Sequence, residues 1–227
     1  MADILRLENL NYGYIDGGYK REILKNLSYT FESGKFYTIL GASGSGKTTL
    51  LSIVGGLDTA ESGELYFEGK NVVKEIGLSK YRRNSIAVVF QQYNLISYLT
   101  AVENVMVAMA ETDNPIPKDQ KNVAYNLLER FGIVKTKADR RVNRLSGGEQ
   151  QRVAIARALA SNVDLILADE PTGNLDTATE KEIIGIFEDL AHEFGKTIIV
   201  VTHSDQVARM SDHCVQLKEG ILQDLED

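Results

Sequence analysis

The sequence lacks several features, and three of these absences exclude a class of protein or site. It has no tryptophan, three prolines and a single cysteine, Cys214, among 227 residues. One cysteine excludes an internal disulfide framework and a zinc cluster built from cysteines, so we expect Cys214 to be a small buried apolar residue in a reducing compartment. No apolar run approaches the roughly 20 residues needed to cross a bilayer. The N-terminal stretch MADILRLENL also lacks the basic region and long apolar core of a secretory signal.

Basic charge is also in short supply, with 25 Lys and Arg residues against 32 Asp and Glu residues and a net charge of −7. A general nucleic-acid binder needs a basic face, so the composition argues against nucleic acid as a partner. Hydrophobic residues make up 43% of the chain, which is enough for a full core at this length. We therefore expect a globular protein that works in the cytosol.

Four short runs are apolar almost throughout: residues 36–40, 86–90, 163–168 and 197–201. Such continuous runs are typical of strands that are buried on both faces of a parallel sheet. Polar residues follow each run, namely Gly41, Gln91, Asp169 with Glu170, and Thr202 with His203. Ligands of open α/β sheets bind at the carboxyl ends of the strands, so we expect these four ends to line one crevice.

The remaining segments predict helices and outer strands. Apolar spacing predicts helices at 47–54, 120–132 and 178–194; a capping box formed by Thr177 and Glu180 would start the last one, and Gly195 would end it. Alternating segments at 4–10, 23–31, 64–68 and 214–225 predict antiparallel strands. The stretch from about 92 to 160 is mainly helical and lies between two core strands. We expect one domain, 1–227, with a core (1–91 and 161–227) and a helical subdomain (92–160).

The stretch GASGSGKT, residues 41–48, matches G-x-x-x-x-G-K-[ST] and sits between a predicted strand and a predicted helix, as a P-loop does. Its glycines allow backbone N–H groups to wrap a phosphate. Lys47 is expected to reach the β- and γ-phosphates, and Thr48 to offer its hydroxyl to Mg²⁺. The predicted nucleotide-binding set is Gly41, Ala42, Ser43, Gly44, Ser45, Gly46, Lys47, Thr48 and Thr49.

The strand ends supply the remaining chemistry. Asp169 suits the Mg²⁺ shell, and Glu170 suits a general base for the water that attacks the γ-phosphate. His203 is placed to hydrogen-bond the γ-phosphate or that water, and Gln91 to contact Mg²⁺ or water. A lone histidine or glutamine is weak evidence of a functional role. Only the neighbouring P-loop strengthens that interpretation for His203 and Gln91. We expect His192 and His213 to be surface or packing residues.

A second anion-binding helix start appears in RLSGGEQQR, residues 144–152. Ser146 is placed as an N-cap, and Glu149 three residues later completes a capping box. Gly147 and Gly148 leave backbone N–H groups exposed at the positive end of the helix dipole. One chain thus carries two phosphate-binding helix starts.

Together these residues resemble the ATP-binding subunit of ABC transporters over nearly the whole chain. The LSGGEQQR stretch matches the family signature, and the other motifs follow in family order: Walker A 41–48, VVFQQ around Gln91, Walker B 164–169 with Glu170, GNLD 173–176, and His203. The stretches VVFQQYNLISYLTAVENV and ADEPTGNLDTATEKEI are similar to the bacterial group of lipoprotein-release, macrolide-export and antimicrobial-peptide-resistance ATPases. Ala42 departs from the proline of many relatives and leaves the P-loop pattern intact.

The resemblance implies an α/β P-loop NTPase fold with a mostly parallel core sheet, an antiparallel β subdomain and an inserted α-helical subdomain. It implies ATP and Mg²⁺ as cofactors, and a head-to-tail dimer in which Ser146, Gly147 and Gly148 bind the ATP held by the partner's P-loop. Asn174, Leu175 and Asp176 would line the seam. Tyr14 matches the residue that stacks on adenine, with Tyr12 as the competing candidate.

The implied partner is a separate membrane permease, which would hold the chain at the cytoplasmic face of the membrane. The segment from Tyr93 to Leu99 is the expected groove for a cytosolic helix of that permease, although ordinary packing of its apolar residues explains them equally well. Rival interpretations are an ATPase of the same superfamily that acts on nucleic acid or the ribosome, and a small-molecule phosphotransferase. The phosphotransferase would not explain the signature.

Overall fold

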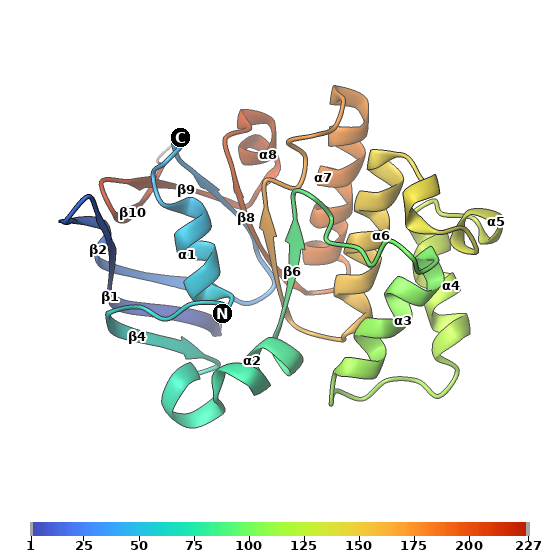
Figure 1. Cartoon of the computed structure of the whole chain (residues 1–227), viewed down its shortest axis with the longest axis horizontal. Coiled ribbons are helices and arrows are strands. Elements are labelled where there is room, and N and C mark those ends of the chain that lie inside the picture. Colours follow the sequence, from blue (N-terminus) through green and yellow to red (C-terminus); the bar gives the residue numbers. More distant parts are fainter. Residues whose placement is uncertain (1, 226–227) are drawn as a thin grey trace.

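The computed structural model describes residues 2–225. Two sheets and a group of helices make up the fold (Figure 1). The strands are β1 (Asp3–Asp16), β2 (Tyr19–Glu32), β3 (Phe36–Leu40), β4 (Ser62–Phe67), β5 (Lys70–Asn71), β6 (Ile86–Phe90), β7 (Leu165–Asp169), β8 (Thr197–Thr202), β9 (His213–Lys218) and β10 (Ile221–Asp224). The helices are α1 (Lys47–Val54), the π-helix η1 (Val72–Ile76), α2 (Leu78–Asn84), α3 (Ala101–Glu111), α4 (Gln120–Arg130), α5 (Lys135–Ala138), the 3-10 helix η2 (Val142–Arg144), α6 (Gly147–Ala160), α7 (Thr177–His192) and α8 (Asp205–Met210).

The larger sheet has the order β10-β9-β3-β8-β7-β6, and its pairs from β9 to β6 are parallel. The four apolar runs of the sequence form β3, β6, β7 and β8, as predicted. Successive residues of β7 point to opposite cores: Ile166 packs against the helices α3, α4, α6 and α7, whereas Leu165 and Leu167 pack against α1 and the smaller sheet. Burial on both faces explains why the run is apolar without alternation.

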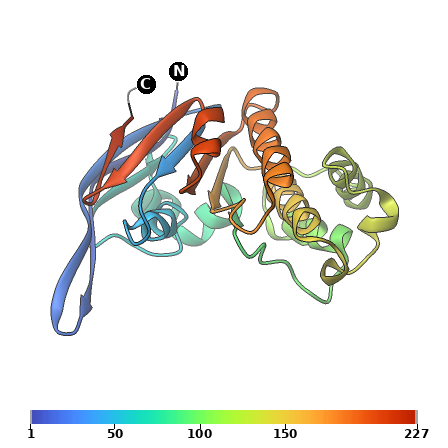
Figure 2. The same ribbon diagram turned by 90° about the horizontal axis from the view of Figure 1, so that it is seen from above.

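The smaller sheet is antiparallel, with the order β2-β1-β4-β5. Its strands β1 and β2 form a long hairpin that projects at one end of the molecule, while α4 and α5 lie at the other end (Figure 2). The predicted antiparallel segment 214–225 needs a correction. It divides into β9 and β10, and β9 pairs in parallel with β3 because it follows the helix α8 and returns to the core sheet.

The capping box predicted for Thr177 and Glu180 is wrong. Asp176 is the N-cap of α7, and its carboxylate accepts hydrogen bonds from the N–H groups of Ala178 and Thr179. Aspartate is at least as strong an N-cap as threonine, so the helix begins one residue earlier and Glu180 is released from the capping role. In residues 2–225, no helix combines the length and apolar character needed to span a bilayer.

Candidate functional site

The P-loop connects β3 to α1. Gly44 and Gly46 have φ angles of +78° and +102°, a region in which residues with a side chain are strained. No side chain caps the first N–H groups of α1. Lys47 is 9% exposed, and its Nζ donates to the carbonyl oxygens of Gly41 at 2.6 Å and Ala42 at 3.3 Å. The loop thus combines the positive end of a helix dipole with a buried cation, which favours an anion.

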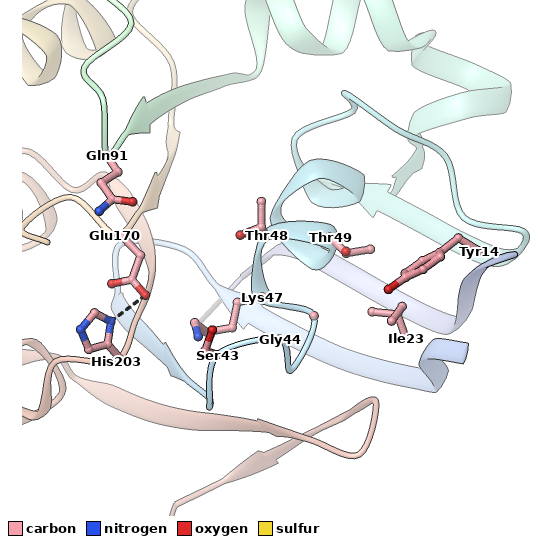
Figure 3. A pocket seen from close by; sticks show the side chains of 11 residues that line it. Tyr14, Ile23, Ser43, Gly44, Lys47, Thr48, Thr49, Gln91, Glu170 and His203 are labelled. Atoms are coloured by element: carbon pink, nitrogen blue, oxygen red, sulfur yellow. Dashed lines mark hydrogen bonds and ion pairs between the residues drawn. The ribbon is translucent and has the colours of Figure 1, made fainter. Parts of the chain in front are cut away.

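A cavity of about 630 Å³ opens at this loop. Its lining consists of Tyr14, Ile23, Ser43, Gly44, Gly46, Lys47, Thr48, Thr49, Gln91, Glu170 and His203 (Figure 3). Convergence of the ends of β6, β7 and β8 on one crevice is therefore confirmed: Gln91, Glu170 and His203 lie on one side of the P-loop, and Tyr14 and Ile23 on the other. Ile23 was not predicted as a site residue, because an isoleucine in a strand cannot be distinguished from a core residue by sequence alone.

Glu170 is fixed through both carboxylate oxygens. His203 Nδ1 lies 2.9 Å from Oε1, within hydrogen-bond distance, and Thr202 Oγ1 donates to Oε2 at 2.9 Å. The backbone of Glu170 has φ +44°, which is strained for a residue with a side chain. Its side chain is 17% exposed, whereas that of His203 is 73% exposed. A carboxylate that is held by two hydrogen bonds on a strained backbone, at the wall of an anion-binding cavity, is suited to proton transfer. Thr202 was predicted only as the end of a strand, and its contact with this carboxylate was not predicted.

Asp169 lies beside the P-loop, although it is not among the lining residues. Burial raises the pKa of its carboxyl group, and the charge of Glu170 acts in the same direction. A hydrogen bond with Thr48 and the charge of Lys47 oppose that rise in pKa. A carboxylate that is costly to ionise, next to a hydroxyl, would gain from a bound cation. In the described part of the chain, no three His, Cys, Asp or Glu side chains gather as a metal-binding group.

Gln91 lies against the loop that follows Glu170. Its Nε2 is 3.5 Å from Asn174 Oδ1, and Asn174 Nδ2 is 3.4 Å from the Gln91 carbonyl oxygen. The next residues, Tyr93 and Asn94, have φ angles of +61° and +47°, and their carbonyl oxygens accept hydrogen bonds from Arg157 of α6 at 3.0 and 2.6 Å. Arg157 thus joins the Gln91 loop to α6, a contact between distant segments for which the sequence gives no signal.

The second helix start is built as predicted. Ser146 is the N-cap of α6 and forms a capping box with Glu149, with Ser146 N 2.8 Å from Glu149 Oε2 and Glu149 N 3.4 Å from Ser146 Oγ. A Cβ atom added to Gly147 would lie 2.9 Å from Tyr93 Oη, and one added to Gly148 would lie 2.4 Å from Thr179 Cγ2. None of residues 146–148 is among those that line the cavity at the P-loop.

The two competing tyrosines have different surroundings. Tyr14 lines the cavity and is 43% exposed, whereas Tyr12 donates to Asp58 Oδ2 at 2.6 Å and packs against the core. The geometry therefore favours Tyr14 as the residue free to meet a ligand.

The structure also tests the predictions for the other two histidines and for the cysteine. His192 Nε2 lies 3.0 Å from Asp212 Oδ1, and His213 stacks on Tyr37 with ring centroids 4.8 Å apart. Neither histidine lines the cavity, so their prediction as surface or packing residues is confirmed. Cys214 is half-buried, not buried as predicted, because it lies on β9 near the edge of the sheet.

Comparison with known proteins agrees with this geometry. Residues 24–173 match the family model described as "ABC transporter". The chain is 44% identical to the uncharacterized ABC transporter ATP-binding protein YclH of Bacillus subtilis, over 96% of this chain and 94% of YclH. It is 45% identical to the lipoprotein-releasing system ATP-binding protein LolD of Aquifex aeolicus, over 97% of this chain and 96% of LolD.

Among solved structures, the chain is similar to the dimeric, post-hydrolysis ATP-binding cassette MJ0796 bound to ADP and Pi. The TM-score is 0.87 at 38% identity, over 99% of this chain and 100% of that one; MJ0796 comes from Methanocaldococcus jannaschii. These similarities do not favour the alternative of an ATPase that acts on nucleic acid or the ribosome. The chain belongs to the ABC transporter family, as one of its ATP-binding and ATP-hydrolysing subunits.

Proposed function

We propose that two copies of this chain hydrolyse ATP at sites that each combine one chain's P-loop with the other chain's signature. The observation that carries this proposal is the separation of the two helix starts. The cavity at the P-loop is lined by one anion-binding helix start, while Ser146, Gly147 and Gly148 are not among its lining residues. A head-to-tail pair of chains would bring each signature to the other chain's phosphates and complete two sites.

The P-loop side of each site would bind ATP through the backbone of residues 41–49. In this proposal Lys47 contacts the β- and γ-phosphates, and Tyr14 stacks on adenine, supported by its exposed position in the cavity lining. Thr48, Asp169 and Gln91 offer hydroxyl, carboxylate and amide oxygens, which are the donors that Mg²⁺ prefers. The hydrogen bond between Thr48 and Asp169 supports a shared role. When bound, Mg²⁺ would neutralise charge on the phosphate oxygens.

We assign proton transfer to Glu170. Its carboxylate would accept a proton from the attacking water, while His203 holds the carboxylate in place and hydrogen-bonds the γ-phosphate or that water. The support is geometric: Glu170 and His203 line the cavity, and their side chains are 2.9 Å apart. Hydrolysis would remove the phosphate that both chains contact, so that the pair of chains opens.

We further propose that the ATPase drives a separate permease from the cytoplasmic face of the membrane. The segment from Tyr93 to Leu99 is the candidate contact: Tyr98 is 71% exposed, while Tyr93 and Leu95 pack against the core. A groove lined by α2, β6, α3 and α6 adjoins it and includes Arg82 and Arg83 of α2 and Arg157 of α6, with Glu111 as its acid. In this interpretation the chain divides into a core (1–91 and 161–227) and a helical subdomain (92–160) that moves with the permease.

Mixing two inactive variants tests the shared site. Lys47→Ala damages the P-loop, and Ser146→Arg blocks the signature. A mixed dimer would have one doubly damaged site and one intact site, so a mixture of the variants should form ATP-dependent dimers that neither variant forms alone. The measurement is sedimentation velocity with ATP, in a Glu170→Gln background that slows hydrolysis. Absence of dimers from every mixture, with dimers present for Glu170→Gln alone, would contradict sites shared between chains.

Glu170→Gln tests the assignment of the base. The amide keeps the shape of the side chain but accepts a proton poorly, so ATP binding should stay within about twofold while the hydrolysis rate falls at least about 100-fold. Glu188→Gln is the matched control, because it makes the same change at a glutamate of α7 that does not line the cavity. A Glu170→Gln variant that hydrolyses ATP at the parental rate would refute the assignment.

A further inference from the structure

Glu180 makes contacts that neither the capping prediction nor the proposed reaction explains. It lies in the first turns of α7, half-buried, and its Oε1 accepts two hydrogen bonds. Ser204 Oγ donates at 2.8 Å and Thr172 Oγ1 donates at 3.2 Å. One carboxylate oxygen thus joins three segments that are separate in the sequence.

Both donors belong to loops that carry the proposed chemistry. Thr172 follows Glu170 by two residues, in a tight turn where Gly173 N donates to the Glu170 carbonyl oxygen at 3.1 Å. Ser204 directly follows His203. The loop after β7 and the loop after β8 are therefore attached to the same point on α7.

A continuous chain of hydrogen bonds runs from Glu180 to the carboxylate of Glu170. Ser204 donates its hydroxyl to Glu180 and its backbone N–H to Thr202 Oγ1, at 3.1 Å. Thr202 in turn donates its hydroxyl to Glu170 Oε2 at 2.9 Å. Removal of the acceptor at Glu180 would release Ser204, and with it the segment that orients both Thr202 and His203.

The same two turns of α7 also contact the signature helix. Thr179 lies against Gly148, and Glu182 pairs with Arg152 of α6 at 2.8 Å. The attachment point of the two loops is therefore next to the start of α6, which carries Ser146.

We propose that Glu180 is a positioning residue for hydrolysis: by holding Thr172 and Ser204 on α7, it fixes the Glu170–His203 pair in its working geometry. The inference rests on the proposed roles of Glu170 and His203. Glu180 does not line the cavity and acts only through the two hydroxyl groups. Hydrogen bonds to an ionised acceptor are stronger than neutral ones, which suits a junction of this kind.

The test compares three substitutions on α7. Glu180→Leu removes the acceptor at similar volume, Glu180→Gln keeps an amide oxygen that accepts from both hydroxyl groups, and Glu188→Leu makes the same change two turns later on the helix. We expect Glu180→Leu to lower kcat at least tenfold with the KM for ATP within about twofold. Glu180→Gln should recover most of that loss, and Glu188→Leu should retain the parental kcat.

A double substitution separates positioning from a general loss of stability. If Glu180 acts through Ser204, adding Ser204→Ala to Glu180→Leu should lower kcat far less than the product of the two single effects. If Glu180→Leu does not fold, Ser204→Ala combined with Thr172→Val removes the same two hydrogen bonds and should give the same tenfold fall in kcat.

Three results would overturn the proposal: parental kcat in Glu180→Leu, an equal loss in Glu188→Leu, or no rescue by Glu180→Gln. A failure of the proposed function is distinguishable, because it appears as parental hydrolysis in Glu170→Gln, whatever the Glu180 variants do.

Discussion

The two anion-binding helix starts of this chain use glycine for different physical reasons. In the P-loop, Gly44 and Gly46 adopt left-handed backbone angles, and no side chain caps the helix that follows. At the signature, the helix is capped by Ser146, and the glycines have no left-handed angles. Gly147 and Gly148 are needed there because Tyr93 and Thr179 approach closely. The shape of the P-loop is therefore set by its own backbone, whereas the signature is held by neighbouring segments.

Among substitutions at the two helix starts, the largest effect is expected at Gly46. Alanine there would sit at φ +102°, and its Cβ would lie 2.6 Å from Ile23 Cγ2. Strain of this kind costs about 1–3 kcal/mol, so Gly46→Ala should weaken ATP binding by about tenfold or more. Trimming the neighbour with Ile23→Ala should not restore affinity, because the backbone strain remains. Titration calorimetry measures the affinity for ATP. Full rescue by Ile23→Ala would show that Gly46, like the signature glycines, is needed only because a neighbouring side chain approaches closely.

A smaller and reversible effect is expected at Gly148. Its added Cβ would meet Thr179 Cγ2 at 2.4 Å, and overpacking of this kind costs about 1–3 kcal/mol. Gly148→Ala should lower kcat for ATP hydrolysis about tenfold while the affinity of the chain's own P-loop for ATP is unchanged. Thr179→Ser removes the clashing methyl group but keeps the hydroxyl that donates to Asp176, so the double variant should regain activity. Persistent loss in the double variant would contradict the steric explanation.

The smallest expected effect concerns the acids beside the two helix starts. Burial raises the pKa of Asp169, so between about pH 4 and that raised pKa the folded chain binds more protons than the unfolded chain, and stability falls as pH rises. For Glu149, burial alone would raise the pKa, but hydrogen bonds from Lys137 and Ser146 outweigh it and lower the pKa. Its contribution is present above about pH 4 and is lost as pH falls through the lowered pKa.

Neutral substitutions should therefore act in opposite directions. In nucleotide-free protein with EDTA at pH 7, Asp169→Asn should raise Tm by about 1–3 °C, and Glu149→Gln should lower it by a similar amount. The Asp169 difference should shrink toward pH 4, because the parental carboxyl group becomes protonated on the way, whereas the Glu149 difference should persist to about pH 4 and be lost only as pH falls through the lowered pKa of Glu149. Thermal unfolding followed by circular dichroism measures both. Shifts of the same sign in the two variants would contradict the assigned pKa directions.

Local patterns in the sequence predicted the parts of the fold that depend on local physics. The run FYTIL became β3 and residues 47–54 became α1, because burial on both faces and a glycine loop leave clear signatures. The hairpin was underestimated: strands expected at 4–10 and 23–31 extend to Asp16 and start at Tyr19. Its tip is solvent-exposed, with Ile15 at 79% and Tyr19 at 83%, so no burial pattern marks it.

The sequence predicted the P-loop side of the candidate site better than its supporting contacts. Lys47, Glu170 and His203 follow motifs with fixed spacing, and all three line the cavity. The contacts that hold them come from side chains distant in sequence, such as Glu180, whose partner at position 204 follows another strand. A capping rule assigned Glu180 to Thr177, and only the folded chain shows that Asp176 occupies that role.

The two hydrogen bonds from Arg157 hold the loop after Gln91 against α6, so we expect the two segments to move together. Separating them would leave a guanidinium group without acceptors and two carbonyl groups without donors, which is costly in a half-buried position. A push on residues 93–94 from outside would therefore be transmitted through Arg157 and along α6 to its N-cap, Ser146. In the proposed pair of chains, such a force would shift Ser146 relative to the other chain's P-loop.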